Sequence, residues 1–322
     1  MSTKGTTQDI STQGIGLARP QRLRRRRDGE RFAPLFLLLP AGVLVFALRV
    51  VPMLVAVYLS FTDTDLSRPS TAPVGNVGLG NYATVLGSAD FWDAISTTIW
   101  IVVPALILEM SLGLGIALWM NRPMRARSFF RGASLIPYLL VPVVIGNFFR
   151  MFYSAQFGQL NYYLSFFGIG QHAWLTETST VRWAVVAMEV WHTTPFVALL
   201  CLAGLSGIPR DPLEAAIVDG ANAWQRFRYV VLPALWPILG ATLALRAMDA
   251  IQLFDEVYVL TGGGPGRLSS VINLYLYQFG FRQFRIGQTS AAVTLMVGSI
   301  SIMCLLVVLI MRNRRAWRGG GK

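Results

Sequence analysis

Long apolar stretches separated by short polar segments are the feature that most restricts the fold of this chain. A helix that crosses the hydrocarbon core of a bilayer needs about 20 mostly apolar residues. The sequence offers six suitable stretches, over residues 32–61, 95–120, 133–153, 183–205, 231–260 and 287–311. We therefore expect an all-α integral membrane protein with six transmembrane helices. Prolines inside these stretches predict kinks, because a proline removes one backbone hydrogen bond; they are Pro40, Pro52, Pro104, Pro142, Pro195 and Pro237.

The charge content argues against an ordinary soluble domain. Hydrophobic residues make up 54% of the chain and charged residues only 14%, whereas soluble domains carry about 25% charged residues. The net charge of +12 would by itself suit nucleic-acid binding. However, the basic residues gather at the two ends, at Arg24–Arg27 and over residues 312–322, and the apolar stretches lie between them. This distribution is typical of cationic flanks held on the cytoplasmic side of a membrane.

The charges of the loops predict an orientation. The segment after the first apolar stretch carries Asp63, Asp65, Asp90 and Asp93 against Arg68, and the loop after the second carries Arg122, Arg125, Arg127 and Arg131. Because basic loops tend to stay in the cytoplasm, both termini are expected to be cytoplasmic. The fifth connection departs from this rule, since it is expected outside and yet carries Arg267, Arg282 and Arg285 without an acid.

Three regions follow from this topology. Residues 1–31 are polar and then Arg-rich, and we expect a disordered basic cytoplasmic tail. Residues 32–311 form the transmembrane domain, with a cytoplasmic loop over 208–232, and residues 312–322 form a second basic tail. The first apolar stretch and its basic leader are too long for a signal peptide, so we interpret this stretch as a membrane anchor.

Catalytic, metal and nucleotide sites are not expected. The chain has two cysteines, Cys201 and Cys304, and two histidines, His172 and His192, which is too few for a disulfide framework or a histidine-rich metal site. The glycines of residues 262–267 lack the Gly-Lys-Ser/Thr ending of a phosphate-binding loop. The sequence offers no Ser/His/Asp set and no suitable carboxylate pair. We therefore expect a protein that is not an enzyme and carries no cofactor of its own.

The loop between the fourth and fifth apolar stretches predicts two short helices. Asp211 suits an N-cap, Pro212 suits the first turn, and Glu214 completes a capping-box pattern. Asp219-Gly220 offers a left-handed turn that would end this helix. A second helix is expected from about Asn222 and would lead into Pro233. Two short helices joined at a glycine would make a stiff cytoplasmic projection that a partner could contact.

This loop resembles the EAA loop of binding-protein-dependent importer permeases. The resemblance rests on Glu214-Ala215-Ala216, then Asp219-Gly220-Ala221, then Leu232-Pro233. In that family the loop forms coupling helices that dock on an ATPase subunit, so the resemblance implies a coupling role for Glu214, Ala215, Ala216, Asp219, Gly220 and Ala221. It also implies that ATP and Mg²⁺ are bound by the partner ATPase and not by this chain.

The resemblance covers about residues 32–311 and is strongest to sugar permeases of the maltose and glycerol-phosphate type. Three further stretches carry it: Gly78–Tyr82 with Phe91-Trp92, Gly204-Leu205 with Ile208-Pro209, and Phe254-Asp255 with Tyr258–Pro265. It implies the first of two permeases that pair as a heterodimer in the cell inner membrane. Two ATPase subunits and an extracytoplasmic substrate-binding protein would complete an importer of a sugar, oligosaccharide or polyol.

Polar residues inside the apolar stretches are candidates for the substrate pathway, because ionisable groups in a bilayer face the interior of the helix bundle. Arg246 and Asp249 lie three residues apart and can pair on one helix face. The resemblance places the cavity along the fourth and fifth stretches and implies that it is lined by Trp191, Thr193, Phe196, Arg246, Asp249, Ala250 and Leu253. A purely structural role for the Arg246–Asp249 pair remains open. For Glu109 and His192 we favour a structural role.

An ion-coupled secondary transporter of small polar solutes is the alternative function. Such folds usually contain inverted repeats and helices broken at the bilayer midplane. The sequence shows no convincing repeat, and this alternative leaves the EAA-like loop without a role. The importer hypothesis instead predicts alternating access driven by the ATPase subunits.

Overall fold

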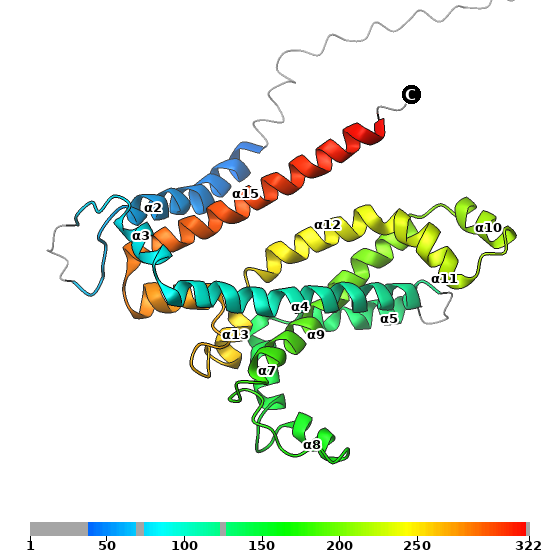
Figure 1. The fold of residues 1–322 in the computed structure, drawn as a ribbon, viewed down its shortest axis with the longest axis horizontal. Helices are drawn as coiled ribbons and strands as arrows, with labels where there is room; N and C mark the ends of the chain where they lie inside the picture. Colours follow the sequence, from blue (N-terminus) through cyan, green and yellow to red (C-terminus); the bar gives the residue numbers. More distant parts are fainter. Residues whose placement is uncertain (1–37, 69–73, 123–126, 320–322) are drawn as a thin grey trace, which may run out of the picture. The chain divides into compact units, whose positions relative to one another are not determined.

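The computed structural model describes residues 38–68, 74–122 and 127–319 (Figure 1). Within those residues all regular elements are helices, and one isolated β-bridge joins Thr62 to Asn76. The chain divides into two compact units, Met1–Leu54 and Val55–Lys322. The expected tail over residues 1–31, the first residues of the first apolar stretch, and Arg125 lie outside the described residues.

The elements follow one another as short and long helices. In chain order they are η1 (Phe46–Val50), α2 (Val51–Ser60), α3 (Gly80–Leu86), α4 (Ala89–Met120), α5 (Arg127–Ser134), α6 (Ile136–Leu139), α7 (Pro142–Phe152), α8 (Gln159–Ser165), α9 (Val181–Ser206), α10 (Asp211–Val218), α11 (Ala223–Arg226), η2 (Phe227–Val231), α12 (Leu232–Ala250), α13 (Asp255–Leu260), α14 (Ile272–Tyr277), η3 (Gln278–Arg282) and α15 (Ile286–Gly319).

Four helices of the described chain are long and apolar enough to cross a membrane: Leu38–Ser60, Ala89–Met120, Val181–Ser206 and Ala223–Ala250. They correspond to the first, second, fourth and fifth apolar stretches. A shorter apolar helix, Pro142–Phe152, falls in the third stretch, and the apolar segment Ile286–Ile302 of α15 falls in the sixth. The prolines Pro104, Pro195 and Pro237 lie inside α4, α9 and α12.

The third apolar stretch is not one continuous helix. It is divided among α5, α6 and α7, and Val141 between the last two has an extended backbone with φ −67° and ψ 135°. Val141 precedes Pro142, and the residue before a proline is driven out of the helical region by the proline ring. The fifth stretch is also interrupted, because α12 ends at Ala250 and α13 begins at Asp255. Both interruptions border the cavity described below.

Packing inside the second unit is closest between α4 and α9. Ala117, Val197 and Leu202 belong to one buried cluster that joins α4, α9 and α12. A second cluster joins α4, α7, α9 and α13 around Ile145 and Val257. Figure 1 shows α4 running alongside α9, with α7 and α13 at one end of this pair. The buried side chains therefore fix α4, α9, α12 and α13 relative to one another.

Gly113 sets how closely α4 approaches α9. A Cβ atom added at Gly113 would lie 2.6 Å from Val197 Cγ1, whereas one added at Gly115 would meet nothing within 4 Å. We expect Gly113→Ala to destabilise the protein by about 1–3 kcal/mol, because over-packing forces side chains or backbone to shift. Gly115→Ala is the matched control, since it gains the same helix propensity without a clash. The thermal midpoints of the two purified variants compare them, and equal midpoints would contradict the packing role of Gly113.

The arginines of the fifth connection meet acids of the segment after the first apolar stretch. Arg267 pairs with Asp90 at the start of α4. Arg285 lines a cavity of about 290 Å³ together with Asp63, Asp65 and Arg68. Two of the three arginines that depart from the expected orientation rule therefore have acidic neighbours, and those acids come from a segment expected on the same side of the membrane. Arg282 instead contacts Tyr258.

Candidate functional site

The first candidate site is the projection formed by α10 and α11, which we call the coupling hairpin. The structure differs from the sequence prediction at its start: Arg210 is the N-cap, and it makes no side-chain capping bond. Asp211 and Pro212 therefore occupy the first two helical positions. The capping box predicted for Asp211 and Glu214 is wrong, because the helix already begins at Asp211 and the N-cap is the residue before it.

The capping box occurs instead at α11. The Asn222 side chain accepts a hydrogen bond from the Gln225 N–H at 2.9 Å, and the Gln225 side chain accepts one from the Asn222 N–H at 2.8 Å. The expected start of the second helix at Asn222 agrees with this geometry. From Ala223 the helix continues through η2 into α12 without a break, as one helix Ala223–Ala250.

Gly220 makes the turn between the two helices. Its φ of +77° is in the left-handed region that only glycine enters without cost. The Ala221 N–H donates to the Ala216 carbonyl and the Gly220 N–H donates to the Ile217 carbonyl, which is the bond pattern of a Schellman cap. The predicted glycine turn is therefore present, and capping bonds on both of its sides fix its geometry.

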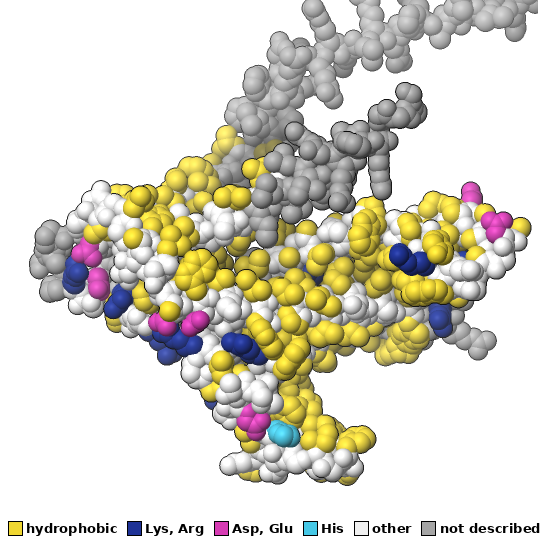
Figure 2. Space-filling model, viewed as in Figure 1, with side chains coloured by type: hydrophobic (Ala, Val, Ile, Leu, Met, Phe, Trp, Pro, Cys, Tyr) yellow, Lys and Arg dark blue, Asp and Glu magenta, His cyan; other side chains and the backbone are white. Residues whose placement is uncertain are grey.

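The residues predicted for coupling lie together on this hairpin. Glu214, Ala215, Asp219 and Gly220 are exposed, and Ala216 and Ala221 are half-buried. Large apolar side chains accompany them: Val218 is 87% exposed and Trp224 is 68% exposed. In Figure 2 acidic and apolar side chains lie side by side over the segment that carries α10. The hairpin thus presents small, acidic and apolar groups to a partner surface.

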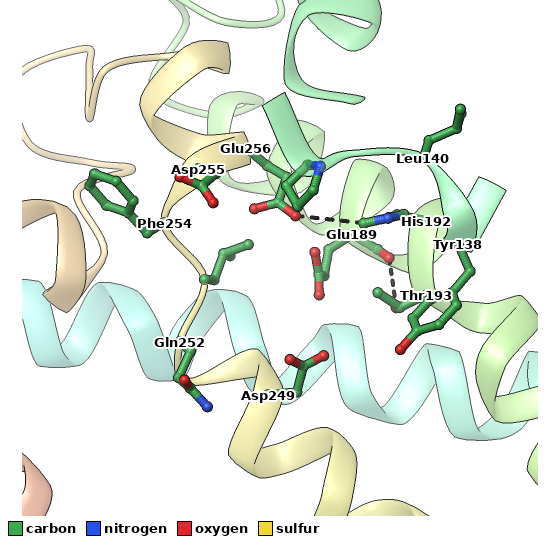
Figure 3. Close-up of a pocket in the computed structure, with 12 residues that line it drawn as sticks. Tyr138, Leu140, Glu189, His192, Thr193, Asp249, Gln252, Phe254, Asp255 and Glu256 are labelled. Atoms are coloured by element: carbon green, nitrogen blue, oxygen red, sulfur yellow. Dashed lines mark hydrogen bonds and ion pairs between the residues drawn. The ribbon is translucent and has the colours of Figure 1, made fainter. Parts of the chain in front are cut away.

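The second candidate site is a cavity of about 310 Å³ where α9, α12, α13 and the α6–α7 break meet (Figure 3). Its lining comprises Tyr138, Leu140, Pro142, Glu189, His192, Thr193, Asp249, Gln252, Leu253, Phe254, Asp255 and Glu256. The break at Val141 and the break after Ala250 each contribute lining residues. The lining residue Glu256 is positioned by a close contact between α7 and α13. A Cβ atom added at Gly146 would lie 2.9 Å from the Glu256 carbonyl oxygen, so the glycine allows α13 to approach α7.

Beside the cavity, a buried ion cluster joins three helices. Arg246 of α12 donates from Nε to Glu109 Oε2 at 2.9 Å, from Nη2 to Glu109 Oε1 at 3.2 Å, and from Nη2 to Glu189 Oε1 at 2.9 Å. Its Nη1 pairs with Asp249. Arg246, Glu109 and Glu189 are buried, whereas the Asp249 side chain is 63% exposed. Because the charges are desolvated and mutually bonded, removal of one member would leave the others uncompensated.

The predicted pathway residues divide between the cavity wall and its surroundings. Thr193, Asp249 and Leu253 line the cavity. Arg246 and Ala250 lie buried behind it. Phe196 stacks on Tyr138 with ring centroids 4.7 Å apart, and Tyr138 lines the cavity. Trp191 contacts Phe148 and Phe149 of α7 and does not line the cavity.

Several polar atoms of the cavity have no hydrogen-bond partner. These are Glu189 Oε2 and both ring nitrogens of His192, although His192 Nδ1 lies 3.6 Å from Glu256 Oε1. The potential ligand atoms of Glu189, His192 and Glu256 lie within 4.8 Å of one another. Among the described residues, these three could hold a cation. Glu189 and Glu256 are not predicted as lining residues from the sequence, because their convergence depends on the two helix breaks.

Comparison with known proteins places the chain among transport proteins. Residues 109–315 match the family described as "Binding-protein-dependent transport system inner membrane component". The trehalose/maltose transport system permease protein MalF of Thermococcus litoralis is 34% identical over 84% of this chain and 92% of its own length. The trehalose transport system permease protein SugA of Mycobacterium tuberculosis is 36% identical over 88% of this chain and 89% of its own.

The fold is also found among solved structures. A chain of a bacterial alginate ABC transporter, solved in complex with an alginate pentasaccharide-bound periplasmic protein, superposes with a TM-score of 0.75. It is 21% identical, and the match covers 89% of this chain and 96% of that chain. This likeness shows that most of the chain shares the fold of that chain.

Proposed function

Because the chain belongs to the family of binding-protein-dependent transport system inner membrane components, we propose that it moves a sugar, oligosaccharide or polyol across the cell inner membrane by alternating access. The chain is a membrane permease subunit of an importer that works with a substrate-binding protein. The proposal of a sugar substrate is supported by two relatives that are permeases of trehalose or maltose transport systems. In this proposal the chain crosses the membrane six times, with both termini in the cytoplasm.

The observation that carries the proposal is the coupling hairpin. Capping bonds on both sides of Gly220 hold α10 and α11 in one geometry, and the exposed faces combine Glu214 and Asp219 with large apolar side chains. A free cytoplasmic loop would not retain Val218 and Trp224 in water, because such side chains gain free energy by burial. The hairpin therefore fits a groove in a partner subunit.

We infer that the partners are a second homologous permease, two ATPase subunits and an extracytoplasmic substrate-binding protein. The ATPases bind ATP and Mg²⁺, and this chain has no cofactor and catalyses no reaction. Closure of the ATPases displaces the coupling hairpins, and the two permeases rock between inward-open and outward-open states. The binding protein delivers substrate at the opposite face of the membrane.

The cavity is the part of the proposed pathway that this chain supplies. An aromatic ring can cover the C–H face of a sugar while polar groups meet its hydroxyls. Tyr138, stacked on Phe196, provides such a ring, and Glu189, His192 and Asp249 provide polar atoms. Trp191 lies outside this cavity, so in the proposal it acts in the packing of α7 against α9.

Reconstitution of the complete complex in proteoliposomes tests the proposal. Radiolabelled trehalose and maltose are added outside together with the binding protein, and uptake is measured with or without ATP inside. We expect uptake only when both ATP and binding protein are present, and no change when an ionophore removes ion gradients. The isolated chain should hydrolyse no ATP. Uptake that survives without ATP and collapses with the ionophore would instead support an ion-coupled transporter.

A further inference from the structure

The lining of the cavity is rich in carboxyl groups. Four carboxyl side chains, from Glu189, Asp249, Asp255 and Glu256, line it, and its described lining contains no lysine or arginine. Figure 3 shows these four side chains and His192 arranged around the same space. A ligand in the cavity therefore meets many acceptor oxygens. The Thr193 hydroxyl already donates to the Glu189 carbonyl, so the side-chain donors of the described lining are those of Tyr138, Gln252 and His192.

The nearest cation is not available to a ligand. All three nitrogen atoms of the Arg246 guanidinium are bonded to carboxylates, those of Glu109, Glu189 and Asp249. Its side chain is 1% exposed. Arg246 therefore neutralises part of the acidic cluster from behind the cavity wall and cannot pair with an anionic group of a substrate.

One buried carboxyl oxygen at the cavity has no partner among the described residues. Glu189 Oε2 makes no hydrogen bond, and Glu189 is only 5% exposed. A buried polar atom without a partner costs free energy that a ligand can restore. The free oxygen of Glu189 can accept a hydrogen bond from a hydroxyl or ammonium group of a ligand.

We infer that this cavity accepts saccharides that present hydroxyl or ammonium donors and rejects saccharides that carry carboxylate, sulfate or sulfonate groups. The inference rests on the proposed function and assigns the charge class of its substrate. Rejection arises because an anionic sugar would place like charges together in a site of low dielectric constant, whereas a neutral or cationic sugar gains hydrogen bonds. Specificity of this kind belongs to the permease and is separate from that of the binding protein.

Three probes of the same ring size test the inference: glucosamine, glucose and glucuronate. Their dissociation constants are measured by saturation-transfer NMR on the purified importer complex without its binding protein, at pH 7. We expect glucosamine to bind at least tenfold more tightly than glucuronate, with glucose between them. Equal binding of the three, a preference for glucuronate, or no binding of any probe would overturn the inference.

A variant at the cavity tests whether this chain causes the preference for glucosamine over glucuronate. Asp255 is exposed and lines the cavity, so Asp255→Asn should leave the fold intact and lower the glucosamine-to-glucuronate preference about threefold to tenfold. Asp93→Asn is the matched control, because Asp93 is exposed on α4 and does not line the cavity; it should leave the preference unchanged. An equal change in both variants, or none in Asp255→Asn, would overturn the inference. Uptake driven by ATP and the binding protein is measured in a separate assay. The proposed function can therefore be confirmed even if the predicted preference for glucosamine over glucuronate is not found.

Discussion

Replacement of Arg246 by methionine is expected to destabilise the permease by about 3–5 kcal/mol, the usual cost of breaking a buried ion pair. The variant keeps an apolar side chain of similar length but leaves Glu109 and Glu189 buried without their cation. Within the described part of the chain, those carboxylates connect α4 and α9 to α12 through Arg246. The thermal midpoint of the purified complex, followed by tryptophan fluorescence, measures the loss.

Two further variants separate charge compensation from packing. Asp249→Asn removes a member of the same cluster whose side chain is 63% exposed, and its effect should be small because solvent screens that charge. Combining Arg246→Met with Glu109→Met and Glu189→Gln removes the buried charges together and should recover most of the lost stability. An Arg246→Met complex that unfolds at the same temperature as the parent would show that the cluster does not hold these helices.

Charge reversal at Glu214 is expected to reduce ATP-driven uptake by on the order of a hundredfold, because the loss of one buried interfacial charge partner costs about 2–5 kcal/mol. Glu214 is exposed on α10 and makes no contact that the fold depends on. Glu214→Lys should therefore insert into the membrane and keep its thermal midpoint. The measurements are uptake into proteoliposomes and co-purification of the ATPase subunits.

Asp93→Lys is the control for this prediction, because it makes the same charge change on an exposed helical position outside the coupling hairpin. It should leave co-purification of the ATPases unchanged. Uptake by Glu214→Lys at the parental rate would contradict a docking role for the hairpin. Loss of uptake with a lowered thermal midpoint would instead indicate damage to the fold.

The sequence predicted the long helices well because their signal is local. The second and fourth apolar stretches correspond to α4 and α9, whose ends lie within a few residues of the expected ones at most boundaries. The divided third stretch was not predicted as such, although Pro137 and Pro142 are present in it. Proline alone does not distinguish a kink from a break, since neighbouring helices decide whether the freed backbone groups find partners.

The candidate site was predicted only in part, because many of its contacts join residues far apart in the sequence. The Arg246–Asp249 pair follows from spacing along one helix, and the structure contains it. The bonds from Arg246 to Glu109 and Glu189 join residues 137 and 57 positions apart, and no local pattern encodes such contacts. Likewise, Glu256 reaches the cavity because α13 packs on Gly146 of α7. The capping box was assigned to the wrong helix because both Asp211 and Asn222 have suitable residues three positions later.

One continuous helix, Ala223–Ala250, begins next to the capped turn of the coupling hairpin and ends beyond Arg246. At 1.5 Å per residue its 28 residues span about 42 Å. Although η2 and Pro237 lie within it, the helix is not divided, so the coupling hairpin and the ion cluster are joined by one continuous helix. In the proposed mechanism, a displacement of the coupling hairpin by the ATPase subunits would be transmitted to the cavity along this helix. It would not need a series of contacts between other side chains.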